Sequence, residues 1–536
     1  MNILTLLQNY WDRLVKKISF LWRLPHKKPV DFPFARSDIA MLYRSAKSDD
    51  VKRIDEHTAK DMLLDAYADR LAVGSSIFAQ QMLHQRLRVD TQDNDGRQRL
   101  QKLIADPVLH GILQQHCLPL REVEIEISEQ IFTHAIPDPA AWYKFMWLLP
   151  VGTILLLLLA LTSTAYAWLA VVLAWGVLLA LQARYSDRIE EWSKKLQTLR
   201  ALLKSFNSLE NQAPSDTPTQ TEDGNQAHRI MRSLSRPAFM FLPVVKEYTE
   251  WFLLDNIRHY FKTCMIVRNN QDFLRRVYLR VANLEADLAL VRHLQSVPQY
   301  CWSSPASGKR LHLQHVVHPL LQQASALSIA LEGKGAFVSG QNGIGKSTLL
   351  RTIGLNLIVA RAFGFCYAAS ASVPVGAVYS SMQSEDSLMV SESLYQAELR
   401  RAKELLDVAG SHQQTVFVID EIFRGTNHQE SISAAAAVLQ SLSSSSMVIV
   451  SSHNLVLAPL LESYLTPLCV VADHSDKSRL QLTEGVLADP NGIRLLSSYG
   501  FGEDIKNKAS RVFDWLSDYL IHPDKCEQLL ESSGSA

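Results

Sequence analysis

The most prominent pattern along the chain is an apolar stretch over residues 145–181 that carries no charged side chain. A polar triplet at 162–164 divides it into two segments, 145–161 and 165–181, each at the short end of the length that spans a membrane as a helix. Apolar side chains surround both segments instead of forming one stripe, which disfavours the alternative of a buried hairpin in a soluble core. We therefore expect a hairpin of two transmembrane helices within residues 141–184.

The charges that flank this hairpin predict its orientation. Lys144 precedes the apolar stretch, and Arg184, Arg188, Lys194 and Lys195 follow it. Because Lys and Arg beside membrane spans stay on the cytoplasmic side, both ends of the hairpin are expected in the cytoplasm. The chain is thus predicted to be a multi-pass protein of the inner (cytoplasmic) membrane.

Apolar residues with helical spacing occur on both sides of the hairpin, in residues 54–140 and 185–300. Residues 185–208 predict a long exposed helix, whereas 211–226 lack large apolar groups and are expected to form a flexible linker. The N-terminal segment 1–53 mixes apolar residues with Arg and Lys, which fits an interfacial amphipathic helix on a membrane or an ordinary packing helix. Because charges interrupt its apolar residues, we do not expect it to be a secretory signal sequence.

A glycine-rich loop at 340–348 follows the apolar segment 336–338 and precedes a helical pattern, so it fits the phosphate-binding sequence GxxxxGK[ST] in its strand–loop–helix context. Glycine is needed there because backbone N–H groups must approach the phosphates closely, and the helix N-terminus adds favourable partial charge. Lys346 is expected to reach the β- and γ-phosphates of ATP, and Ser347 to ligate Mg²⁺. The predicted nucleotide-binding residues are Gly340, Asn342, Gly343, Gly345, Lys346, Ser347 and Thr348.

A second apolar strand, 415–419, ends in the carboxylates of Asp420 and Glu421. Ligands bind at the carboxyl edge of an open parallel sheet, so Asp420 is expected to hold Mg²⁺ and Glu421 to activate the attacking water. The strand 447–452 brings His453 to the same edge, where its imidazole can bind the γ-phosphate. A helix cap for the acidic pair and a structural role for the lone histidine are the alternatives. The predicted catalytic residues are Glu421, Lys346 and His453.

Composition and charge restrict the partners. A chain of 536 residues is too long for one hydrophobic core and predicts several units. Lys plus Arg equal Asp plus Glu at 54 each, so binding to nucleic acid or anionic lipid requires a local patch. One basic concentration lies at 256–282, and it fits DNA phosphates or, alternatively, a solvated or lipid-facing helix face. The candidate DNA contacts are Arg268, Arg275, Arg276 and Arg280.

Three motifs together resemble the MutS family of ABC-type ATPases. GQNGIGKSTLLRTIG, from Gly340 onward, looks like the phosphate loop of that family, with Gln341 and Ile344 in place of a proline and a glycine. DEIFRGTNHQE (420–430) and SSHNLVLAPLLE (451–462) are similar to the family's DExxRGT and THxxxL segments. The resemblance covers about residues 54–130 and 185–515.

The resemblance implies a multidomain fold: an α-helical core and lever domain with the transmembrane hairpin inserted, then an α/β P-loop ATPase domain of the ABC/MutS type. On this basis 54–140 begins the helical core, 185–300 forms the lever helices, 301–515 is the ATPase domain and 516–536 is a tail. The family pairs two ATPase domains, so a homodimer is expected, with ATP and Mg²⁺ as ligands. The implied trans contacts are Ser393 and Glu398 toward the partner's nucleotide and Thr426 and Asn427 at the interface.

Two functions remain open from the sequence. The first is a membrane-anchored ATPase whose ATP-driven dimer changes act on double-stranded or branched DNA. The second is a membrane-bound ATP switch that acts on a protein or lipid partner without binding DNA. No Phe-x-Glu wedge is visible near the N-terminus, so mismatch recognition is not expected. An ABC transporter is disfavoured, because only two spans are present and no LSGGQ-type sequence precedes Asp420.

Overall fold

The computed structural model separates the chain into two compact units. The helical unit comprises Met1–Lys47, Ala72–Gln85 and Lys102–Leu290, and the α/β unit comprises Ser48–Leu71, Arg86–Gln101 and Val291–Ala536. The predicted order, a helical region followed by an α/β domain, is confirmed. The residues that the structure describes are 31–45, 53–89, 95–133, 136, 141–162, 165–210, 218–236, 249–250, 252–322, 324–382, 394–411, 415–472, 480–487, 492, 495 and 503–519.

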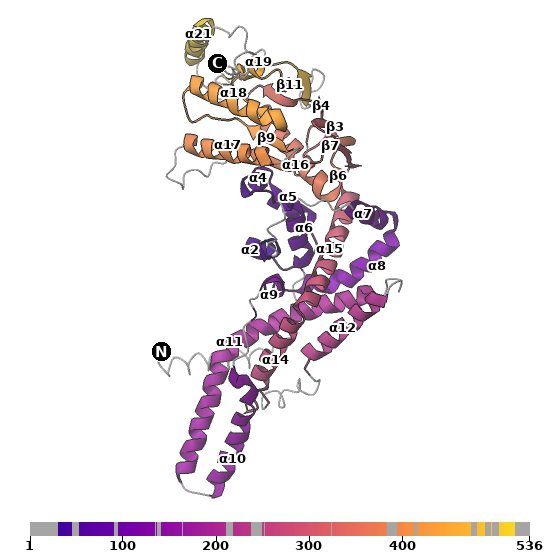
Figure 1. The fold of residues 1–536 in the computed structure, drawn as a ribbon, viewed down its shortest axis with the longest axis vertical. Coiled ribbons are helices and arrows are strands. Elements are labelled where there is room, and N and C mark those ends of the chain that lie inside the picture. Colours follow the sequence, from indigo (N-terminus) through magenta and orange to yellow (C-terminus); the bar gives the residue numbers. More distant parts are fainter. Residues whose placement is uncertain are drawn as a thin grey trace, which may run out of the picture. The chain divides into compact units, whose positions relative to one another are not determined.

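The helical unit is built from helices of very different lengths (Figure 1). Its helices include α2 (Arg36–Ile39), α3 (Met41–Ser45), α8 (Pro107–Cys117), η1 (Leu118–Glu122), α9 (Ser128–Phe132), η2 (Ala141–Phe145), α10 (Leu148–Thr162), α11 (Ala165–Glu210), α12 (Pro218–Leu234) and α14 (Asp255–Asn269). Three helices, α6 (Ile77–Arg88), α7 (Gly96–Ala105) and α15 (Gln271–Ser296), run from one unit into the other along the chain.

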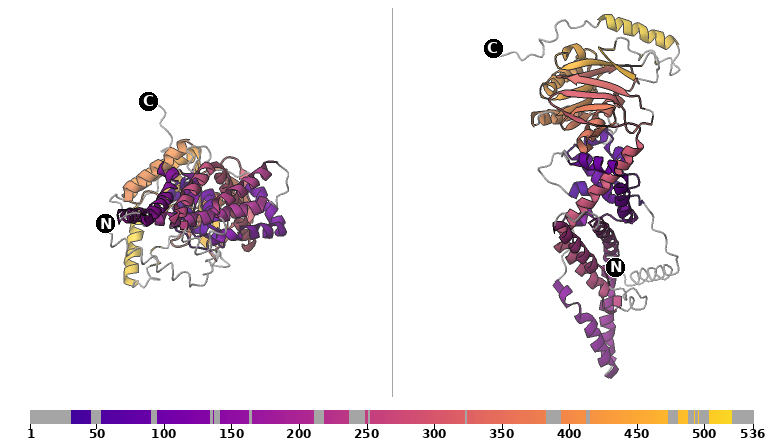
Figure 2. Two further views of the ribbon diagram at one scale, coloured as in Figure 1. Left: turned by 90° about the horizontal axis from the view of Figure 1, so that it is seen from below. Right: turned by 90° about the vertical axis from the view of Figure 1, so that its right-hand side faces the viewer.

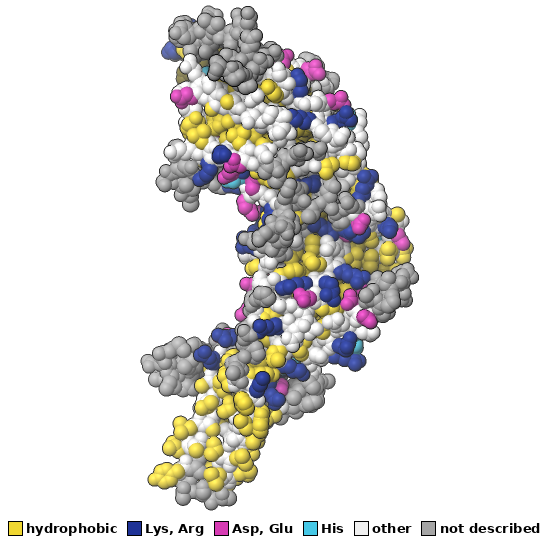
Figure 3. Space-filling view, viewed as in Figure 1, with side chains coloured by type: hydrophobic (Ala, Val, Ile, Leu, Met, Phe, Trp, Pro, Cys, Tyr) yellow, Lys and Arg dark blue, Asp and Glu magenta, His cyan; other side chains and the backbone are white. Residues whose placement is uncertain are grey.

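The apolar stretch forms a helical hairpin. Helices α10 and α11 lie side by side in Figures 1 and 2, and Ser163 and Thr164 between them lie outside the described residues. Two windows, Trp142–Leu161 and Trp168–Glu210, are long and apolar enough to cross a membrane, a criterion of length and composition that core helices of soluble proteins also meet. Only 22% and 17% of these windows are buried, and Figure 3 shows hydrophobic side chains gathered over the hairpin. Apolar surface of this extent is not typical of a helix pair inside a soluble core.

Helix α11 continues without a break for 46 residues from the hairpin into the helical unit. The prediction of an exposed helix over 185–208 is wrong for one face, because Trp192, Leu199 and Leu203 are buried. The Trp192 indole N–H donates a hydrogen bond of 2.8 Å to Thr263 Oγ1 on α14. This half of α11 is therefore part of the core of the helical unit.

The flexible linker predicted for 211–226 is also corrected in part. Residues 218–226 belong to α12, whose apolar positions Ala227, Ile230 and Leu234 are buried, and α12 packs against α11. The polar residues 218–226 can therefore begin a helix whose stability comes from the apolar residues that are buried further along. Residues 211–217 lie outside the described residues, as do 1–30 of the N-terminal segment and 520–536 of the tail.

The α/β unit contains a six-stranded sheet in the order β12-β11-β5-β10-β9-β8, whose strands lie side by side in the right-hand view of Figure 2. All neighbours are parallel except the β11–β12 pair. The strands are β5 (Gly335–Gly340), β8 (Val378–Ser381), β9 (Val416–Asp420), β10 (Met447–Ser451), β11 (Leu465–Ala472) and β12 (Leu480–Glu484). A four-stranded sheet, β2-β7-β3-β4, is formed by Ser304–Ala306, Ser370–Pro374, Arg310–Val316 and Leu327–Glu332, and β1 (Cys301–Trp302) pairs with β6 (Phe365–Cys366).

Alternation along the central strands divides their side chains between two faces. Phe417 and Ile419 face a core shared with α17 (Leu394–Ser411), α18 (His428–Ser445) and α19 (Leu457–Leu460). Val418 points to the other face, toward α16 (Lys346–Phe363), where a Cβ on Gly354 would lie 3.6 Å from its methyl group. Helices therefore cover both faces, as a parallel sheet requires. Helix α21 (Glu503–Tyr519) is the last described element.

An N-terminal segment completes the α/β unit, contrary to the predicted division. Residues 54–71 and 86–101 were expected in the helical core, but they cluster with the α/β unit. Helix α4 (Glu56–Asp61) lies against β8, and α5 (Leu64–Leu71) follows it. The Asp61 carboxylate accepts hydrogen bonds from Ser380 Oγ at 2.7 Å and Met382 N at 2.9 Å. This segment therefore supports the edge of the sheet.

Candidate nucleotide-binding site

The phosphate loop connects β5 to α16 with a backbone that glycine permits. Gly343 and Gly345 have φ values of 76° and 101°, which L-residues other than glycine rarely adopt. At Gly340 a Cβ would approach Val470 O to 3.0 Å and the Ile344 side chain to 3.2 Å, so the close approach of β11 also requires glycine. Asn342 and Gly343 are exposed, and Thr348 is exposed in the first turn of α16. The loop thus presents backbone N–H groups at a helix N-terminus, where an anion is stabilised.

Lys346 is the first residue of α16, and its side chain lies over the loop. Its Nζ donates hydrogen bonds to Gly340 O at 2.9 Å and Gln341 O at 3.2 Å, and the residue is only 7% exposed. Burial lowers the pKa of Lys346, against the opposing effect of the Glu421 and Asp420 carboxylates. A buried ammonium with two carboxylates near it gains a strong partner when phosphate arrives.

The order of the strands brings the three predicted chemical groups to one edge. Strand β10 lies between β5 and β9, and Ser451 is in register with Asp420 on β9 and Val338 on β5. Ser451 Oγ donates a hydrogen bond to Asp420 Oδ1. Strand β10 lies between the strand before the phosphate loop, β5, and the strand that ends in the acidic pair, β9. His453 follows the end of β10 and is therefore placed between the phosphate loop and the acidic pair.

Glu421 lies between His453 and Arg424. Its backbone is left-handed, with φ 56°, and its N–H donates to Ser451 O at 2.9 Å. One carboxylate oxygen lies 2.8 Å from His453 Nε2 and the other 2.6 Å from Arg424 Nη1. Burial acts to raise the pKa of Glu421, but the hydrogen bond from His453 and the charges of Arg424, His453 and Lys346 outweigh it and lower the pKa below its ordinary value of 4.5. The carboxylate is therefore ionised at neutral pH.

Glu398, expected from the resemblance to face a partner chain, is engaged within its own chain. Its carboxylate accepts hydrogen bonds from the backbone N–H of Arg424 and of Gly425, each at 3.1 Å. At Gly425 a Cβ would meet Tyr395 N at 2.6 Å, so α17 and this loop touch through backbone atoms. The expected trans partner Ser393 lies outside the described residues.

Thr426 and Asn427 have local partners at the start of α18. Asn427 is the N-cap of this helix and accepts a hydrogen bond of 2.9 Å from Glu430 N. Thr426 Oγ1 donates to Glu430 Oε2 at 2.5 Å. These contacts stabilise the helix N-terminus by the usual capping mechanism. The interface role implied by the resemblance stays a prediction.

The donor set suits magnesium. Ser347, at the start of α16, and Asp420, at the end of β9, supply a hydroxyl and a carboxylate, which are the oxygen ligands that Mg²⁺ takes together with phosphates and water. Within the described ranges, no group of three or more His, Cys, Asp or Glu residues could hold a metal ion. Two oxygen ligands from the protein are sufficient for an ion that also binds nucleotide phosphates.

The candidate DNA arginines have partners inside the helical unit. Arg275 donates to Ile131 O at 2.8 Å, Arg276 lies 3.8 Å from Asp223, and Arg280 pairs at 2.7 Å with Glu210. Arg268 also interacts with a neighbouring group. The structure thus gives these four side chains intramolecular contacts, which the spacing of the sequence alone could not reveal.

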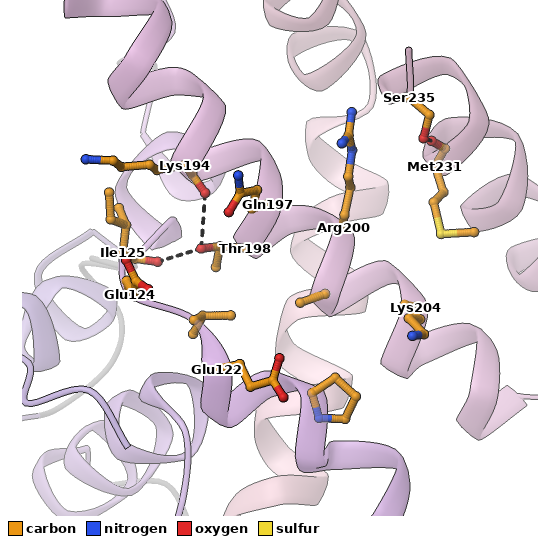
Figure 4. A pocket seen from close by; sticks show the side chains of 13 residues that line it. Glu122, Glu124, Ile125, Lys194, Gln197, Thr198, Arg200, Lys204, Met231 and Ser235 are labelled. Carbon is orange, nitrogen blue, oxygen red and sulfur yellow. Dashed lines mark hydrogen bonds between the residues drawn. The ribbon is translucent and has the colours of Figure 1, made fainter. Parts of the chain in front are cut away.

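The helical unit also contains a cavity of about 360 Å³, and none of the four candidate DNA arginines lines it (Figure 4). It lies between α11 and the 119–125 segment, where Thr198 Oγ1 donates to Ile125 O at 2.9 Å. Lys194 and Lys204 line it together with Glu122, so its charges are mixed. We assign it no ligand.

Residues 336–517 match the family of MutS domain V. This part of the chain belongs to the MutS family. The matched residues include β9, β10 and most of β5, so the MutS-type motifs coincide with the edge at which Lys346, Asp420, Glu421 and His453 gather.

Several MutS relatives are similar over parts of the chain. Endonuclease MutS2 of Thermus thermophilus is 35% identical over 162 residues, which are 30% of this chain and 21% of the relative. DNA mismatch repair protein MutS of Fusobacterium nucleatum is 25% identical over 183 residues, 32% of this chain and 20% of the relative. Endonuclease MutS2 of Streptococcus pneumoniae is 26% identical over 270 residues, 47% of this chain and 33% of the relative. The matched region thus spans a third or less of these relatives.

Two features of the MutS-type site were missed from the sequence. The sequence places Arg424 only within the DEIFRGTNHQE motif, whereas in the structure it contacts the carboxylate of Glu421. Glu398 was assigned to the partner, although it binds the loop that carries Arg424. Both contacts depend on a turn with positive φ at Glu421 and Phe423, and no local spacing rule indicates such a turn for these residue types.

Proposed function

We propose that this MutS-family chain is an ATPase that binds ATP with Mg²⁺ and hydrolyses it at the edge formed by β5, β10 and β9. The convergence of Lys346, Asp420, Glu421 and His453 on this edge carries the proposal. A lone phosphate loop would support nucleotide binding alone. An ionised carboxylate held beside that loop supports hydrolysis as well.

Each group has a separate role in the proposed reaction. The loop amides and Lys346 bind the phosphates, and the ammonium exchanges its carbonyl partners for phosphate oxygens. Glu421 orients the attacking water and accepts its proton, and His453 both holds Glu421 and donates to the γ-phosphate. Ser347 and Asp420 would hold Mg²⁺, which would neutralise phosphate charge.

The first test is phosphate release by the purified full chain in detergent, compared with Lys346→Ala. We expect slow ATP-dependent turnover by the unchanged protein, and loss of both nucleotide binding and turnover in the variant, because the loop loses its cation. Equal turnover by both proteins would mean that a contaminant hydrolyses the ATP, and the proposed site would be rejected.

We propose further that α10 and the first half of α11 anchor the chain in a membrane. The base of the hairpin supports this, because Trp142, Tyr185 and Phe261 form an aromatic cluster with ring centroids 5.5–6.0 Å apart. Arg188 lies over the Tyr185 ring at 5.8 Å. Aromatic rings next to basic side chains are typical of the membrane–water interface. Both hairpin ends and the ATPase domain would then lie in the cytoplasm.

We propose that the protein forms a homodimer that binds DNA and acts on it as ATP is bound and hydrolysed. The support is the family, since its similar members are called an endonuclease and a DNA mismatch repair protein. A second candidate is a membrane switch acting on a protein or lipid without DNA. The hydrogen bond of Arg275 to Ile131 O and the ion pair of Arg280 with Glu210 favour this second candidate, because arginines that are engaged inside the helical unit are less available to phosphates.

ATPase activity with duplex, branched and single-stranded DNA, at low and physiological salt, separates the two. DNA binding predicts stimulation that weakens as salt rises, because counterion release drives contacts to phosphates. Turnover that is indifferent to every nucleic acid, yet responds to lipid composition in vesicles, would reject DNA in favour of the membrane switch.

A further inference from the structure

Helix α17 carries Glu398, whose carboxylate contacts the loop that follows Glu421 in the same chain. We propose that Glu398 is a positioning residue that holds the water-activating Glu421 of the same chain in place through the loop at Arg424 and Gly425. The inference rests on the proposed ATP hydrolysis and deepens it. It replaces the expectation that Glu398 serves the partner's nucleotide.

The first step is the pair of hydrogen bonds between Glu398 and the loop at Arg424 and Gly425. Its two carboxylate oxygens accept from two successive backbone N–H groups, Arg424 to Oε1 and Gly425 to Oε2, each at 3.1 Å. An ionised acceptor makes such bonds stronger than a neutral one. Gly425 permits the approach, because any Cβ there would overlap the backbone of Tyr395 on α17. The loop is therefore fixed to the helix at this point.

The second step is the connection from the loop to Glu421. Arg424 projects its guanidinium back to Glu421, with Nη1 2.6 Å from Oε2. Between them the chain is strained, because Glu421 and Phe423 have φ values of 56° and 57°. Left-handed conformations of such residues are unfavourable and persist only where the surroundings hold them. The bonds from Glu398 supply such a restraint just beyond the turn.

The third step is the support of α17 itself. Arg401, one turn after Glu398, donates from Nε to Ser380 O at 3.0 Å at the end of β8. The same guanidinium pairs with Asp55 at 3.1 Å, and Asp55 is the N-cap of α4. Arg401 is largely buried, with its side chain 11% exposed. The helix that carries Glu398 is thus fixed to the sheet and to α4.

Both carboxylate oxygens of Glu398 are committed to amides of its own chain, which disfavours a role toward a second nucleotide. A carboxylate used in this way would have to release the loop before it could reach a partner. In the resting geometry the contact instead leaves Glu421 with one oxygen on Arg424 and the other on His453. The reacting water would find the base already oriented.

The kinetic test compares Glu398→Gln with Asp407→Asn. Glutamine keeps the shape, but only one of its two terminal atoms accepts, so one amide loses its partner. We expect kcat to fall about tenfold or more with KM within about threefold, since a small misplacement of a catalytic group is costly. Asp407 lies on the same helix, is exposed and pairs only with Lys403 among the described residues, so its amide variant should retain wild-type turnover. Unchanged kcat in Glu398→Gln would overturn the proposal.

Mixed dimers separate the cis role from the trans role. One chain carries Glu398→Ala with Glu421 intact, the other carries Glu421→Gln with Glu398 intact, and the mixed species is purified through two different tags. A cis role predicts turnover no higher than the mean of the two parent variants, because no site has both acids in one chain. Recovery to about half of wild-type turnover would show a trans role. If the wild-type protein itself hydrolyses no ATP, the proposed function fails instead, and if only monomers form, the kinetic test decides.

Discussion

At the scale of single residues, the carboxylate of Glu421 has two neighbours, His453 and Arg424, whose interactions oppose the cost of its burial. His453 and Arg424 together hold the pKa of Glu421 below its ordinary value although burial alone would raise it. A water-activating base works only when deprotonated, so a lowered pKa keeps it available in mildly acidic solution.

This lowered pKa predicts the acid limb of the pH profile. Protonation of Glu421 should reduce kcat/KM only as pH falls through its pKa, so this limb should lie below pH 4.5. Arg424→Gln removes a cation, raises the pKa and should move the limb toward neutral pH. Lys403→Gln, an exposed change on α17, is the control. A limb that does not move would show that Arg424 does not govern this carboxylate.

A second residue prediction concerns Glu421→Gln. The amide cannot take a proton from water, so we expect ATP binding to remain while turnover falls at least about 100-fold, the usual range for removal of a general base. ATP should then hold the protein in a closed dimer, visible by size-exclusion chromatography in detergent. Loss of ATP affinity in this variant would mean that the role of Glu421 is wrong.

Most of this site could be predicted from the sequence, because phosphate loops and acidic strand ends are local patterns. Lys346, Asp420 and Glu421 are fixed by the residues beside them, and the next strand indicates His453. The partners of Arg424 and Glu398 could not be predicted. They lie in contact only because α17 packs on the loop after β9, a meeting that no spacing along the chain encodes.

At the scale of elements, α4 shows how a short helix far away in sequence supports the sheet. Asp55 caps it by accepting from Thr58 N at 2.7 Å, and Thr58 Oγ1 in turn accepts from Ser380 N at 2.9 Å. Asp61 is buried at its end, and burial raises the pKa of this carboxyl despite its hydrogen bonds. Such a helix is too short to be stable alone.

Asp61→Ala should therefore loosen the sheet edge. It leaves the Met382 N–H and the Ser380 hydroxyl without their acceptor, a loss of roughly 1–3 kcal/mol. Hydrogen–deuterium exchange should rise in β8 and α4 while β5 and β10 stay protected. Glu56→Gln, in the exposed first turn of α4, is the control. Equal exchange in all strands of the two proteins would contradict the support that we assign to α4.

Some element boundaries could not be predicted, because tertiary packing decides them. Residues 218–226 read as a linker because their helix is stabilised by apolar residues that follow them and pack on α11. Residues 54–71 read as part of a helical core because periodicity identifies a helix but not the surface that it covers.

At the scale of the whole molecule, the exposed hairpin determines how the protein behaves in solution. We expect the full chain to remain in the membrane fraction after alkaline carbonate washing. Replacement of residues 148–179 by a short Gly/Ser turn should release the protein into the soluble fraction with ATP binding retained. A full chain that is soluble without detergent would contradict the membrane proposal.

The sidedness of the hairpin is a separate prediction. Alkaline phosphatase fused after residue 163 should be active outside the cytoplasm, and the same fusion after residue 210 should be inactive, because two spans return the chain to its starting side. The opposite pattern would place the ATPase domain on the wrong side of the membrane for cytoplasmic ATP.

Helix α11 has a mechanical consequence. With 46 residues at a rise of 1.5 Å each, it is a rod of about 70 Å whose apolar first half and core-packed second half share one unbroken ladder of hydrogen bonds. Such a rod resists bending, so, if its first half spans a membrane as proposed, a sideways force on its second half would tilt that span. The bilayer would then act as an elastic load on the cycle, and its thickness and stiffness would set how easily the arm swings.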